Sequence, residues 1–471
     1  MKVLVVSTNR EPSPYPVAPL GALCVSAAAR AAGHDVDLLD LGAQTFPRHA
    51  LRRALAQGRY QAIGLSIRNL DNCSFARPRS YFAQVRELTQ IVRRLSGAPL
   101  ILGGSGLSVA PRGWMARLAA DYGVVGEGEF TFVELLRRIE AGESVGNLNG
   151  VLRAEDIGRS PGAEPPGIQA EMPRDLDALP PPDHARCNYA RYLARGGFVS
   201  VQTKRGCPFE CIYCVYPRLE GTVCRLRAPE RVVDEMESVV KGQKARHFFI
   251  TDSVFNAPRA HALAVCEALI RRRGAARWMA FCNPLGFDEE LARTMARAGC
   301  AGVEFGLDAA TEKMLARLRK PFSPADIQRS FQAAAAAGLP FAVHLLFGGP
   351  GETVRDLEET QQFLDRCAPA NAVFASLGLR IYEGTELARI ARAEGRLAAD
   401  ADLFEPAFYL SEGLGGEPLR TLDGVARRRE EWSSPTDWHK LALRAVQKLM
   451  NRLGVRPQWR NVRNYGRRMR R

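Results

Sequence analysis

The sequence predicts an α/β protein with an N-terminal doubly wound parallel-sheet domain, then a partial (β/α)6 barrel, then a small C-terminal helical region. Three observations support this fold class. Short apolar runs alternate with helical stretches in two series, over residues 1–141 and 198–395, which is the pattern of parallel sheets covered by helices. Residues 142–197 between them are rich in proline and charge and are predicted to be a linker. The chain has 471 residues, which is more than a single domain with one hydrophobic core usually contains.

The first series predicts five βα units. Strands are expected at residues 2–8, 35–41, 62–67 and 99–104, and the fifth strand is expected to end within residues 122–129. Helices are expected at about 20–32, 47–57, 79–95, 111–120 and 129–141. A sheet of this flavodoxin-like kind binds its ligand beyond the carboxyl ends of its strands, where the strand order reverses. Those ends carry glycine-rich turns, which allow the backbone to approach a ligand closely.

The second series predicts six βα units. Strands are expected at residues 198–203, 247–252, 278–283, 302–308, 340–349 and 373–382. Helices are expected at about 229–240, 258–272, 287–298, 311–317, 324–337 and 353–366. An open sheet would give the same pattern as a partial barrel. In a barrel the chemistry lies at the carboxyl ends of the strands.

The composition is that of a globular protein, with 46% hydrophobic and 25% charged residues. A run of about 18 apolar residues is absent from the sequence, so no transmembrane helix is expected. The N-terminal "MKVLVVSTNR" turns polar too early for a signal peptide, and we predict a cytoplasmic location. The eleven cysteines show no paired spacing, so we do not expect them to form structural disulfides.

The positive charge is concentrated in the C-terminal region, residues 396–471. Eleven Lys and Arg with no Asp or Glu lie between Lys440 and Arg471, and the rest of the chain carries only +3 of the net +14. A specific nucleic acid is therefore not expected as a partner. Residues 437–454 have apolar residues at helical spacing and a basic opposite face. We predict that they pack on the barrel, with peripheral membrane contact through the basic C-terminus as the alternative.

Three cysteines stand together in "KRGCPFECIYCVYP", residues 204–217. Cys207, Cys211 and Cys214 have the spacing C-x3-C-x2-C, and closely spaced thiolates bind soft metals. A structural zinc site takes four ligands, and Cys224 would have to supply the fourth. A 4Fe–4S cluster held by three cysteines would leave one iron open for a substrate or cofactor. The residues alone leave both alternatives open.

This segment resembles the cluster motif of the radical SAM superfamily. An aromatic residue, Tyr213, precedes the last cysteine, and the motif follows the first strand of a predicted barrel. Four later segments are similar to the superfamily's motifs on strands two, four, five and six: "FITDSVFN" (249–256), "GVEFGLDAATEKMLARLRK" (302–320), "FGGPGET" (347–353) and "RIYEGTELARIA" (380–391). The resemblance implies that the three cysteines ligate a 4Fe–4S cluster whose fourth iron is chelated by S-adenosylmethionine (SAM).

The resemblance also implies a SAM site at the carboxyl ends of the barrel strands. Tyr213 would pack near the adenine, and Asp252 would bond SAM or substrate, or else cap the helix that follows it. Glu304 and Asp308 flank Gly306 at even spacing, so they are expected on one face of their strand. One of these two carboxylates could instead belong to an ion pair of the barrel.

Four further barrel residues complete this prediction. Gly348 and Gly349 suit a tight turn that passes close to the adenosine. Tyr382, at the end of strand six, is a candidate catalytic residue together with Asp252. His344 lies within strand five and is expected to be a satisfied core histidine.

The N-terminal domain resembles the cobalamin-binding domain that precedes many radical SAM domains. The resemblance rests on "GLS" (64–66), "GG" (103–104) and "VVGEGE" (124–129). It differs from the mutase type of this domain because the Asp-x-His-x-x-Gly motif is missing, and neither His34 nor His49 has that context. The cobalamin-binding residues implied are Ser66, Arg68, Asn69, Gly103, Gly104, Ser105, Gly126, Glu127, Gly128 and Glu129.

The function implied is that of a cobalamin-dependent radical SAM C-methyltransferase. Its cofactors would be a 4Fe–4S cluster, SAM and cobalamin, and a reduced donor such as flavodoxin or ferredoxin would supply the electron. The substrate would be an unactivated carbon of a small molecule, lipid or peptide natural product, where general-base chemistry cannot supply a carbanion. A cyclase or ring-rearranging enzyme with the same cofactors is the alternative, and a tRNA methylthiotransferase or a zinc-binding protein is less favoured.

Overall fold

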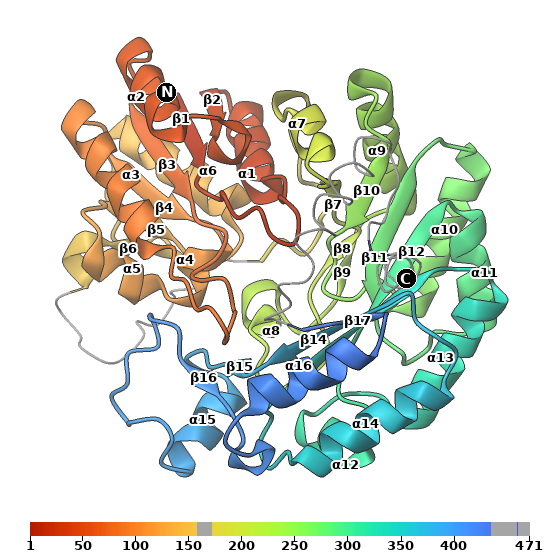
Figure 1. Cartoon of the computed structure of the whole chain (residues 1–471). Coiled ribbons are helices and arrows are strands. Elements are labelled where there is room, and N and C mark those ends of the chain that lie inside the picture. The colour runs from red at the N-terminus through yellow and green to blue at the C-terminus, as the bar shows by residue number, and fades with distance from the viewer. Residues whose placement is uncertain (158–171, 435–458, 460–471) are drawn as a thin grey trace. The chain divides into compact units, whose positions relative to one another are not determined.

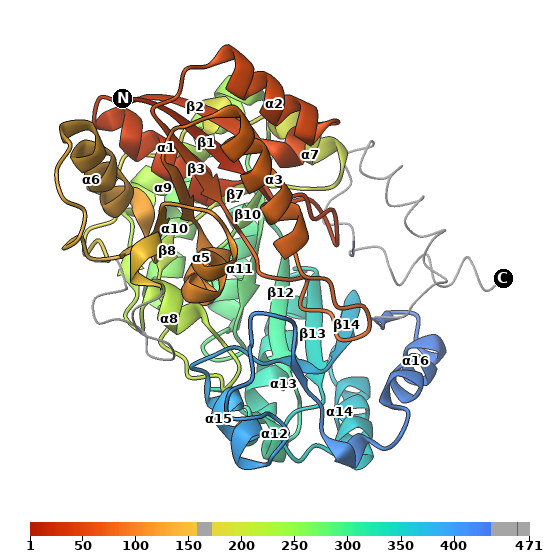
Figure 2. The ribbon, with the colours of Figure 1, turned by 90° about the vertical axis from the view of Figure 1, so that its left-hand side faces the viewer.

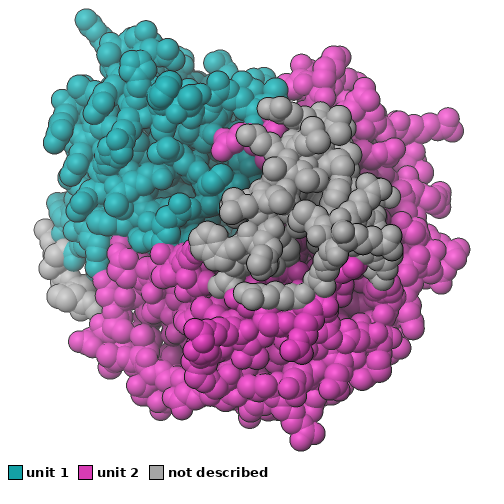
Figure 3. Space-filling model, in the orientation of Figure 1, with its two compact units in different colours: residues 1–72, 79–192, 218–221 teal, residues 73–78, 193–217, 222–471 magenta. Residues whose placement is uncertain are grey.

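The structure is a computed structural model that describes residues 1–157, 172–434 and 459. The chain forms two compact units, which Figure 3 shows in separate colours. Unit 1 comprises residues 1–72, 79–192 and 218–221, and unit 2 comprises residues 73–78, 193–217 and 222–471. The short segment 73–78 therefore leaves the N-terminal unit and belongs to unit 2.

Unit 1 is built on a six-stranded sheet with the order β2-β1-β3-β4-β5-β6. Its strands are β1 (Lys2–Ser7), β2 (Asp35–Asp40), β3 (Ala62–Ser66), β4 (Leu100–Gly103), β5 (Tyr122–Val124) and β6 (Val151–Arg153). The first five are parallel, and β6 is antiparallel to β5. The chain order reverses between β1 and β3, which makes this the doubly wound, flavodoxin-like sheet that the sequence predicts.

Helices cover both faces of this sheet (Figure 1). They are α1 (Leu20–Ala31), α2 (Pro47–Gln57), α3 (Phe82–Leu95), α4 (Ser105–Val109), α5 (Pro111–Arg117) and α6 (Gly128–Ala141). Helices α1 and α6 pack on each other, as do α2 and α3. The core under α1 and α6 includes Val3, Val5, Ala29 and Leu135, all almost fully buried. Burial of these apolar side chains is the main force that holds the layers together.

Part of the predicted linker, residues 142–197, is structured and belongs to unit 1. Strand β6 extends the sheet, and it is followed by a short α7 (Tyr189–Ala194). The side chains of Tyr189 and Tyr192 are buried, and the Tyr192 hydroxyl donates a 2.6 Å hydrogen bond to Asp40. The prediction of a surface connector fails here because two tyrosines in a proline-rich context anchor the segment to the sheet.

Unit 2 is built on a seven-stranded sheet with the order β17-β14-β13-β12-β11-β10-β7, all parallel. Its strands are β7 (Val199–Val201), β10 (His247–Ile250), β11 (Arg277–Cys282), β12 (Cys300–Asp308), β13 (Phe341–Phe347), β14 (Ala372–Leu377) and β17 (Trp432–Ser433). Figure 2 shows these strands and the helices around them. The six predicted strands are present in order, but the sixth, predicted at 373–382, ends at Leu377, because Gly378 has a φ of +77° and residues 379–380 pair in a separate sheet. Strand β17 adds an edge strand. Within the described residues β7 and β17 each pair on one side only, as in a partial barrel.

The six helices predicted for the barrel are present, within a few residues of their predicted positions. They are α9 (Pro229–Gln243), α10 (Arg259–Arg272), α11 (Glu289–Arg297), α12 (Glu312–Arg317), α13 (Pro324–Ala336) and α14 (Val354–Arg366). Sequence signals mark several of their starts. Ser323 and Thr353 each form a capping box with an aspartate three residues later.

Shorter elements surround the barrel ends. They are β8 (Lys204–Arg205) paired with β9 (Arg225–Leu226), α8 (Tyr216–Glu220), β15 (Leu379–Arg380) paired with β16 (Phe408–Tyr409), α15 (Glu386–Ala393) and α16 (Pro418–Arg428). The helix predicted at residues 437–454 lies outside the described residues. Among those that are described, no helix has the length and apolar character needed to cross a membrane.

Candidate active site

The cysteine loop follows the first barrel strand, β7, at its carboxyl end. The loop is closed by pairing of β8 with β9, and Gly206 has a φ of +100°. A Cβ at Gly206 would lie 2.2 Å from the carbonyl oxygen of Val223. Only glycine fits this close approach of two backbones. On its other side the loop is held by a 2.8 Å hydrogen bond from the Leu387 amide to the Ile212 carbonyl.

The three thiols of this loop form a soft donor set. Cys207 is buried, and Cys211 and Cys214 are partly buried free cysteines. Burial raises the pKa of Cys211, and it raises the pKa of Cys214 to about 12, with the charges of the neighbouring thiolates adding to both shifts. Without a metal the thiols of Cys211 and Cys214 are protonated at neutral pH, and binding of a metal would release their protons. Thiolates of this kind fit an iron–sulfur cluster.

Cys224 would have to be the fourth ligand of a zinc site, and its thiol has other partners. It lies 3.7 Å from the carbonyl oxygens of both Gly206 and Ala257. Across the described residues, no three His, Cys, Asp or Glu side chains converge on a point where one metal ion would sit. A cluster takes one thiolate per iron atom, so its ligands need not converge on one point.

A buried ion pair anchors the start of the loop. Lys204 Nζ lies 3.0 Å from Asp252 Oδ2, and both side chains are 1% exposed or less. Asp252 also accepts hydrogen bonds from the Thr203 amide (2.7 Å) and hydroxyl (2.5 Å). Lys204 Nζ donates further to the carbonyls of Val254 and Phe255. Both charges are thus satisfied by the protein, as buried ions require.

This arrangement gives Asp252 a role other than the predicted one. The sequence suggested a ligand of SAM or substrate, a catalytic residue, or a helix cap. In the structure its two carboxylate oxygens are used by Thr203 and Lys204, three or four residues before the first cysteine. The end of β10 thereby fixes the end of β7. We assign Asp252 as a positioning residue for the cysteine loop.

A second charged cluster ties the middle of the loop to β12. The hydroxyl of Tyr213 donates to Asp308 Oδ2, and Lys320 Nζ lies 2.6 Å from the same oxygen. Burial alone would lower the pKa of Lys320, but the negative charge of Asp308 raises it. Removal from water and the same charge raise the pKa of Tyr213. Asp308 therefore forms an ion pair with Lys320, as the sequence analysis allowed for one of the two carboxylates of this strand.

Glu304 lies on the same strand but contacts a different set of residues. Its Oε2 is 2.8 Å from His344 Nε2, and its Oε1 accepts a 2.9 Å hydrogen bond from the indole nitrogen of Trp459. A register shift between Gly306 and Asp308 interrupts the alternation of β12, and Asp308 has a φ of +64°. The expectation of one shared face is wrong in this respect, because the bulge sends the two carboxylates to separate partners.

The glycine turn after β13 is closed by a carboxylate of its own. Glu352 Oε2 accepts hydrogen bonds from the amides of Gly348 (2.5 Å) and Gly349 (2.9 Å). Burial raises the pKa of Glu352 to about 7, although both amide hydrogen bonds act in the opposite direction. The two amides predicted to approach SAM are therefore engaged within the turn.

Tyr382 lies next to the segment that the N-terminal half contributes to unit 2. Its hydroxyl is 3.1 Å from the sulfur of Cys73, and the guanidinium of Arg380 is stacked 4.7 Å from the centre of its ring. In the same segment Phe75 packs edge-on against Phe408. Tyr382 thus contacts Cys73, which is distant in the sequence, and Arg380, which is two residues before it on β15.

In unit 1 the predicted cobalamin residues gather at the carboxyl edge of the sheet. Ser66 at the end of β3 is in register with Gly103 at the end of β4. The Ser105 hydroxyl donates a 2.7 Å hydrogen bond to the Arg68 carbonyl, and the Asn69 side-chain amide donates a 2.9 Å hydrogen bond to the same carbonyl. These contacts hold the two turns together while Arg68 and Ser105 remain exposed.

The glycines of this edge permit that packing. Gly104 has a φ of +93°, and a Cβ there would lie 2.5 Å from the Ile67 carbonyl oxygen. The Gly126 amide donates a 2.8 Å hydrogen bond to the hydroxyl oxygen of Ser108. Beyond it, Glu127 precedes α6 without a side-chain capping bond, Gly128 begins the helix, and Glu129 is buried in its first turn. A polar, glycine-lined edge of this kind fits a cofactor bound beyond the strands.

Unit 1 contains three histidines. His34 precedes β2, at the opposite edge of the sheet, and lies 3.2 Å from the N-terminal amine. His184 lies 2.5 Å from the hydroxyl of Tyr189. His49 lies within α2.

The sequence reading missed several residues of this site. No role is assigned to Lys204, Glu352, Trp459 or Cys73 by the sequence analysis. A lysine directly before a cysteine motif is a local signal that could have been used. The contact of Trp459 with Glu304 joins residues 155 positions apart, so no local pattern could reveal it.

Comparison with known proteins matches two family models to the chain. The model described as the radical SAM superfamily matches residues 201–364, and the model described as the B12 binding domain matches residues 7–136. The first covers the cysteine loop and β10 to β13. The second covers the glycine-lined edge of unit 1.

Individual relatives carry both parts. Tryptophan 2-C-methyltransferase from Streptomyces laurentii is 29% identical over 440 residues, 79% of this chain and 72% of that protein. The radical SAM methyltransferase TsrM from Kitasatospora setae, solved with cobalamin and a [4Fe-4S] cluster, is 25% identical with a TM-score of 0.85, covering 100% of this chain and 98% of that one. The same enzyme with tryptophan and a SAM analogue gives 26% and 0.86.

A third relative represents the ring-forming alternative. The anaerobic magnesium-protoporphyrin IX monomethyl ester cyclase from Rubrivivax gelatinosus is 28% identical over 251 residues. This match covers 50% of the chain and 43% of the cyclase. The methyltransferase matches are therefore the more extensive ones.

Fold and site together define a radical SAM enzyme with a B12-binding domain ahead of its barrel. The chain carries both domains of the cobalamin-dependent radical SAM enzymes and is similar to a solved member over its whole length. The family and the fold class predicted from the sequence are confirmed. A 4Fe–4S cluster, SAM and cobalamin, the predicted cofactors, are those of this family.

Breaking the Lys204–Asp252 pair should destabilise unit 2. Asp252→Leu leaves a buried, unpaired ammonium and should lower the free energy of unfolding by about 3–5 kcal/mol. The double variant Lys204→Met/Asp252→Leu removes both charges and should recover most of that loss. Thermal unfolding and iron content after reconstitution measure both effects. A single variant that unfolds like the wild type but fails to bind SAM would make Asp252 a ligand-binding residue instead.

Replacing Glu352 should flatten the pH dependence of stability. Its folded-state pKa of about 7 lies above its ordinary value of 4.5. The unfolded chain therefore loses this proton first, and stability falls as the pH rises from about 4.5 to 7, by about 3 kcal/mol in total. Glu352→Gln keeps an acceptor for the two amides without ionising. Its unfolding temperature should exceed that of the wild type at pH 8 and match it near pH 4.5.

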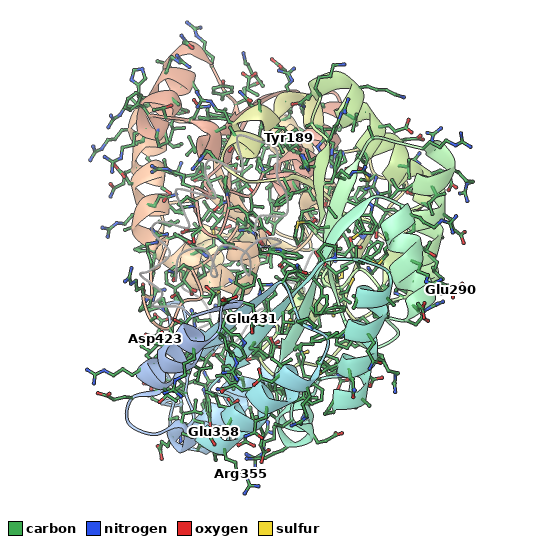
Figure 4. All side chains as sticks on the ribbon, turned by 45° about the vertical axis from the view of Figure 1, so that its right-hand side comes forward. Tyr189, Glu290, Arg355, Glu358, Asp423 and Glu431 are labelled. Carbon is green, nitrogen blue, oxygen red and sulfur yellow. The ribbon has the colours of Figure 1, made fainter. Side chains whose placement is uncertain are left out.

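A matched control for this experiment is Glu358→Gln. Glu358 is an exposed residue of the following helix, α14 (Figure 4). This substitution removes a carboxylate from the same region without touching the turn. If both variants change the pH profile equally, Glu352 is not the group responsible.

Proposed function

We propose that this enzyme uses a 4Fe–4S cluster, SAM and cobalamin to methylate a carbon of a small-molecule substrate. The observation that carries the proposal is the cysteine loop with C-x3-C-x2-C spacing at the carboxyl end of β7, in a chain that also has a B12-binding domain. The extensive matches to two named methyltransferases support methyl transfer over ring formation.

The residues would divide between the cofactors as follows. Cys207, Cys211 and Cys214 would hold the cluster through three of its irons. The SAM site would lie along β12 and the turn after β13, and the cobalamin site along the carboxyl edge of the unit 1 sheet. When bound, these groups supply radical and methyl-transfer chemistry that amino-acid side chains lack.

The protein's own contribution would be positioning. The Lys204–Asp252 pair fixes the start of the cysteine loop, and Asp308 with Lys320 fixes Tyr213 in its middle. Gly306 has open space where a side chain would stand, with no heavy atom within 4 Å of an ideal Cβ. We infer that a ligand lies against this part of β12.

The remaining sequence predictions extend this proposal. An electron donor such as flavodoxin or ferredoxin would reduce the cluster, and a cytoplasmic location would provide one. Lipid and peptide substrates stay predictions beside the small-molecule class. The cyclase and methylthiotransferase alternatives gain no specific observation from the structure.

Anaerobic reconstitution with iron, sulfide and cobalamin tests the function. We expect about four irons per chain and a corrin absorption spectrum. Incubation with SAM and reductant should give S-adenosylhomocysteine from methyl donation and 5′-deoxyadenosine from reductive cleavage. Cys211→Ala should lose most of the iron and both products, whereas Cys367→Ala, at the end of α14, should retain them. Cleavage of SAM without any S-adenosylhomocysteine would rule out methyl transfer.

Membrane contact through the basic C-terminal residues also stays a prediction. The full chain should sediment with vesicles containing anionic lipid, and the interaction should weaken with salt because it is electrostatic. A chain ending at residue 436 should not sediment. Absence of binding by the full chain would contradict the prediction.

A further inference from the structure

A buried carboxylate with aromatic neighbours lies on the inner strands of unit 2. Glu304 on β12 is 3% exposed, and its Oε2 lies 2.8 Å from Nε2 of His344 on β13. A carboxylate accepts hydrogen bonds and a neighbouring imidazole donates one through the nitrogen that faces it. His344 thereby occupies one oxygen of Glu304, and the second oxygen needs a donor of its own.

Aromatic rings surround this pair. The ring of Phe281 on β11 lies edge-on to His344 with 5.5 Å between centroids, and Phe374 on β14 lies 5.0 Å away at 31°. Phe281 is also in register with Glu304 across β11 and β12. The Glu304–His344 pair therefore has flat aromatic neighbours, which pack well against another planar ring.

The second oxygen of Glu304 is reached by the chain itself. Trp459 Nε1 donates a 2.9 Å hydrogen bond to Oε1, and the indole is 6% exposed. The indole N–H is a donor only, so the pairing leaves neither group with an unused polar atom. A planar ring with one N–H, supplied from 155 residues away in the sequence, thus fills the place beside Glu304.

We propose that Glu304 and His344, with Phe281 and Phe374, form a binding site for a planar aromatic ligand that carries an N–H donor, and that Trp459 fills this site until such a ligand displaces it. The statement that this ligand is the methyl acceptor rests on the proposed function. The existence of the site does not, because it depends only on the contacts described above.

The chemistry of the site predicts its selectivity. A ring that carries no N–H would leave Oε1 of a buried carboxylate without a donor when it displaced Trp459. Sites built around such an acceptor reject analogues that lack the matching donor far more strongly than they reject a change in size. Indole should therefore bind better than naphthalene, which has a similar flat shape and no N–H.

Calorimetric titration of the full, cluster-reconstituted chain with indole and with naphthalene tests the site. Trp459→Ala should bind indole about tenfold more tightly than the wild type, because no intramolecular competitor remains. Trp459→Phe keeps a ring but removes the N–H, and its affinity for indole should also exceed that of the wild type. In Trp459→Ala indole should bind at least about tenfold more tightly than naphthalene. Unfolding temperatures of both variants check that the barrel stays folded.

Three results would overturn the proposal. Equal indole affinity in the wild type and Trp459→Ala would show that the tryptophan does not compete. Equal affinity of Trp459→Ala for indole and naphthalene would remove the role of Glu304. Absence of binding to every variant would remove the site. Because the titration measures no turnover, none of these results depends on whether methyl transfer occurs.

Discussion

The candidate active site depends on one buried ion pair, between Lys204 and Asp252. Two charges removed from water are costly, and they are tolerated here because every polar atom of the pair has a partner: Thr203 on one side and two backbone carbonyls on the other. The pair links the ends of two neighbouring strands just before Cys207. The path of the cysteine loop is therefore set before its first cysteine. Gly206 then allows the loop to pass against Val223.

The sequence predicted the layers of the fold well, because each predicted strand is an apolar run long enough to bury itself in a parallel sheet. It missed β6 and β17, which have three and two residues and are defined by their neighbours rather than by their own pattern. It also treated residues 142–197 as a connector, because prolines and charges hid the two buried tyrosines. Short edge strands and single anchoring side chains have no periodicity to detect.

The site was predictable to the extent that it is local in sequence. The cysteine spacing, the glycine turn after β13 and the segment that ends at Lys320 are contiguous motifs. The partners of their side chains are not contiguous, since Asp252, Trp459 and Cys73 each come from a distant element. The bulge in β12 shows most clearly what sequence spacing cannot predict. The even spacing of Glu304 and Asp308 predicts that both side chains lie on one face of the strand, but the bulge adds one residue between them and breaks that alternation.

The acidic residues predicted to meet SAM share one physical property, which is that the protein already supplies their donors. Asp252 is bonded to Thr203 and Lys204, Asp308 to Tyr213 and Lys320, and Glu304 to His344 and Trp459. A carboxylate that is bonded to protein donors positions those neighbours, and a ligand that needs the same acceptor site must displace one of them. Of the three, only Glu304 has a donor on a residue outside the barrel strands and their connecting loops. Exchange of a ligand against a protein group is therefore expected at Glu304, while the other two carboxylates hold the cysteine loop in place.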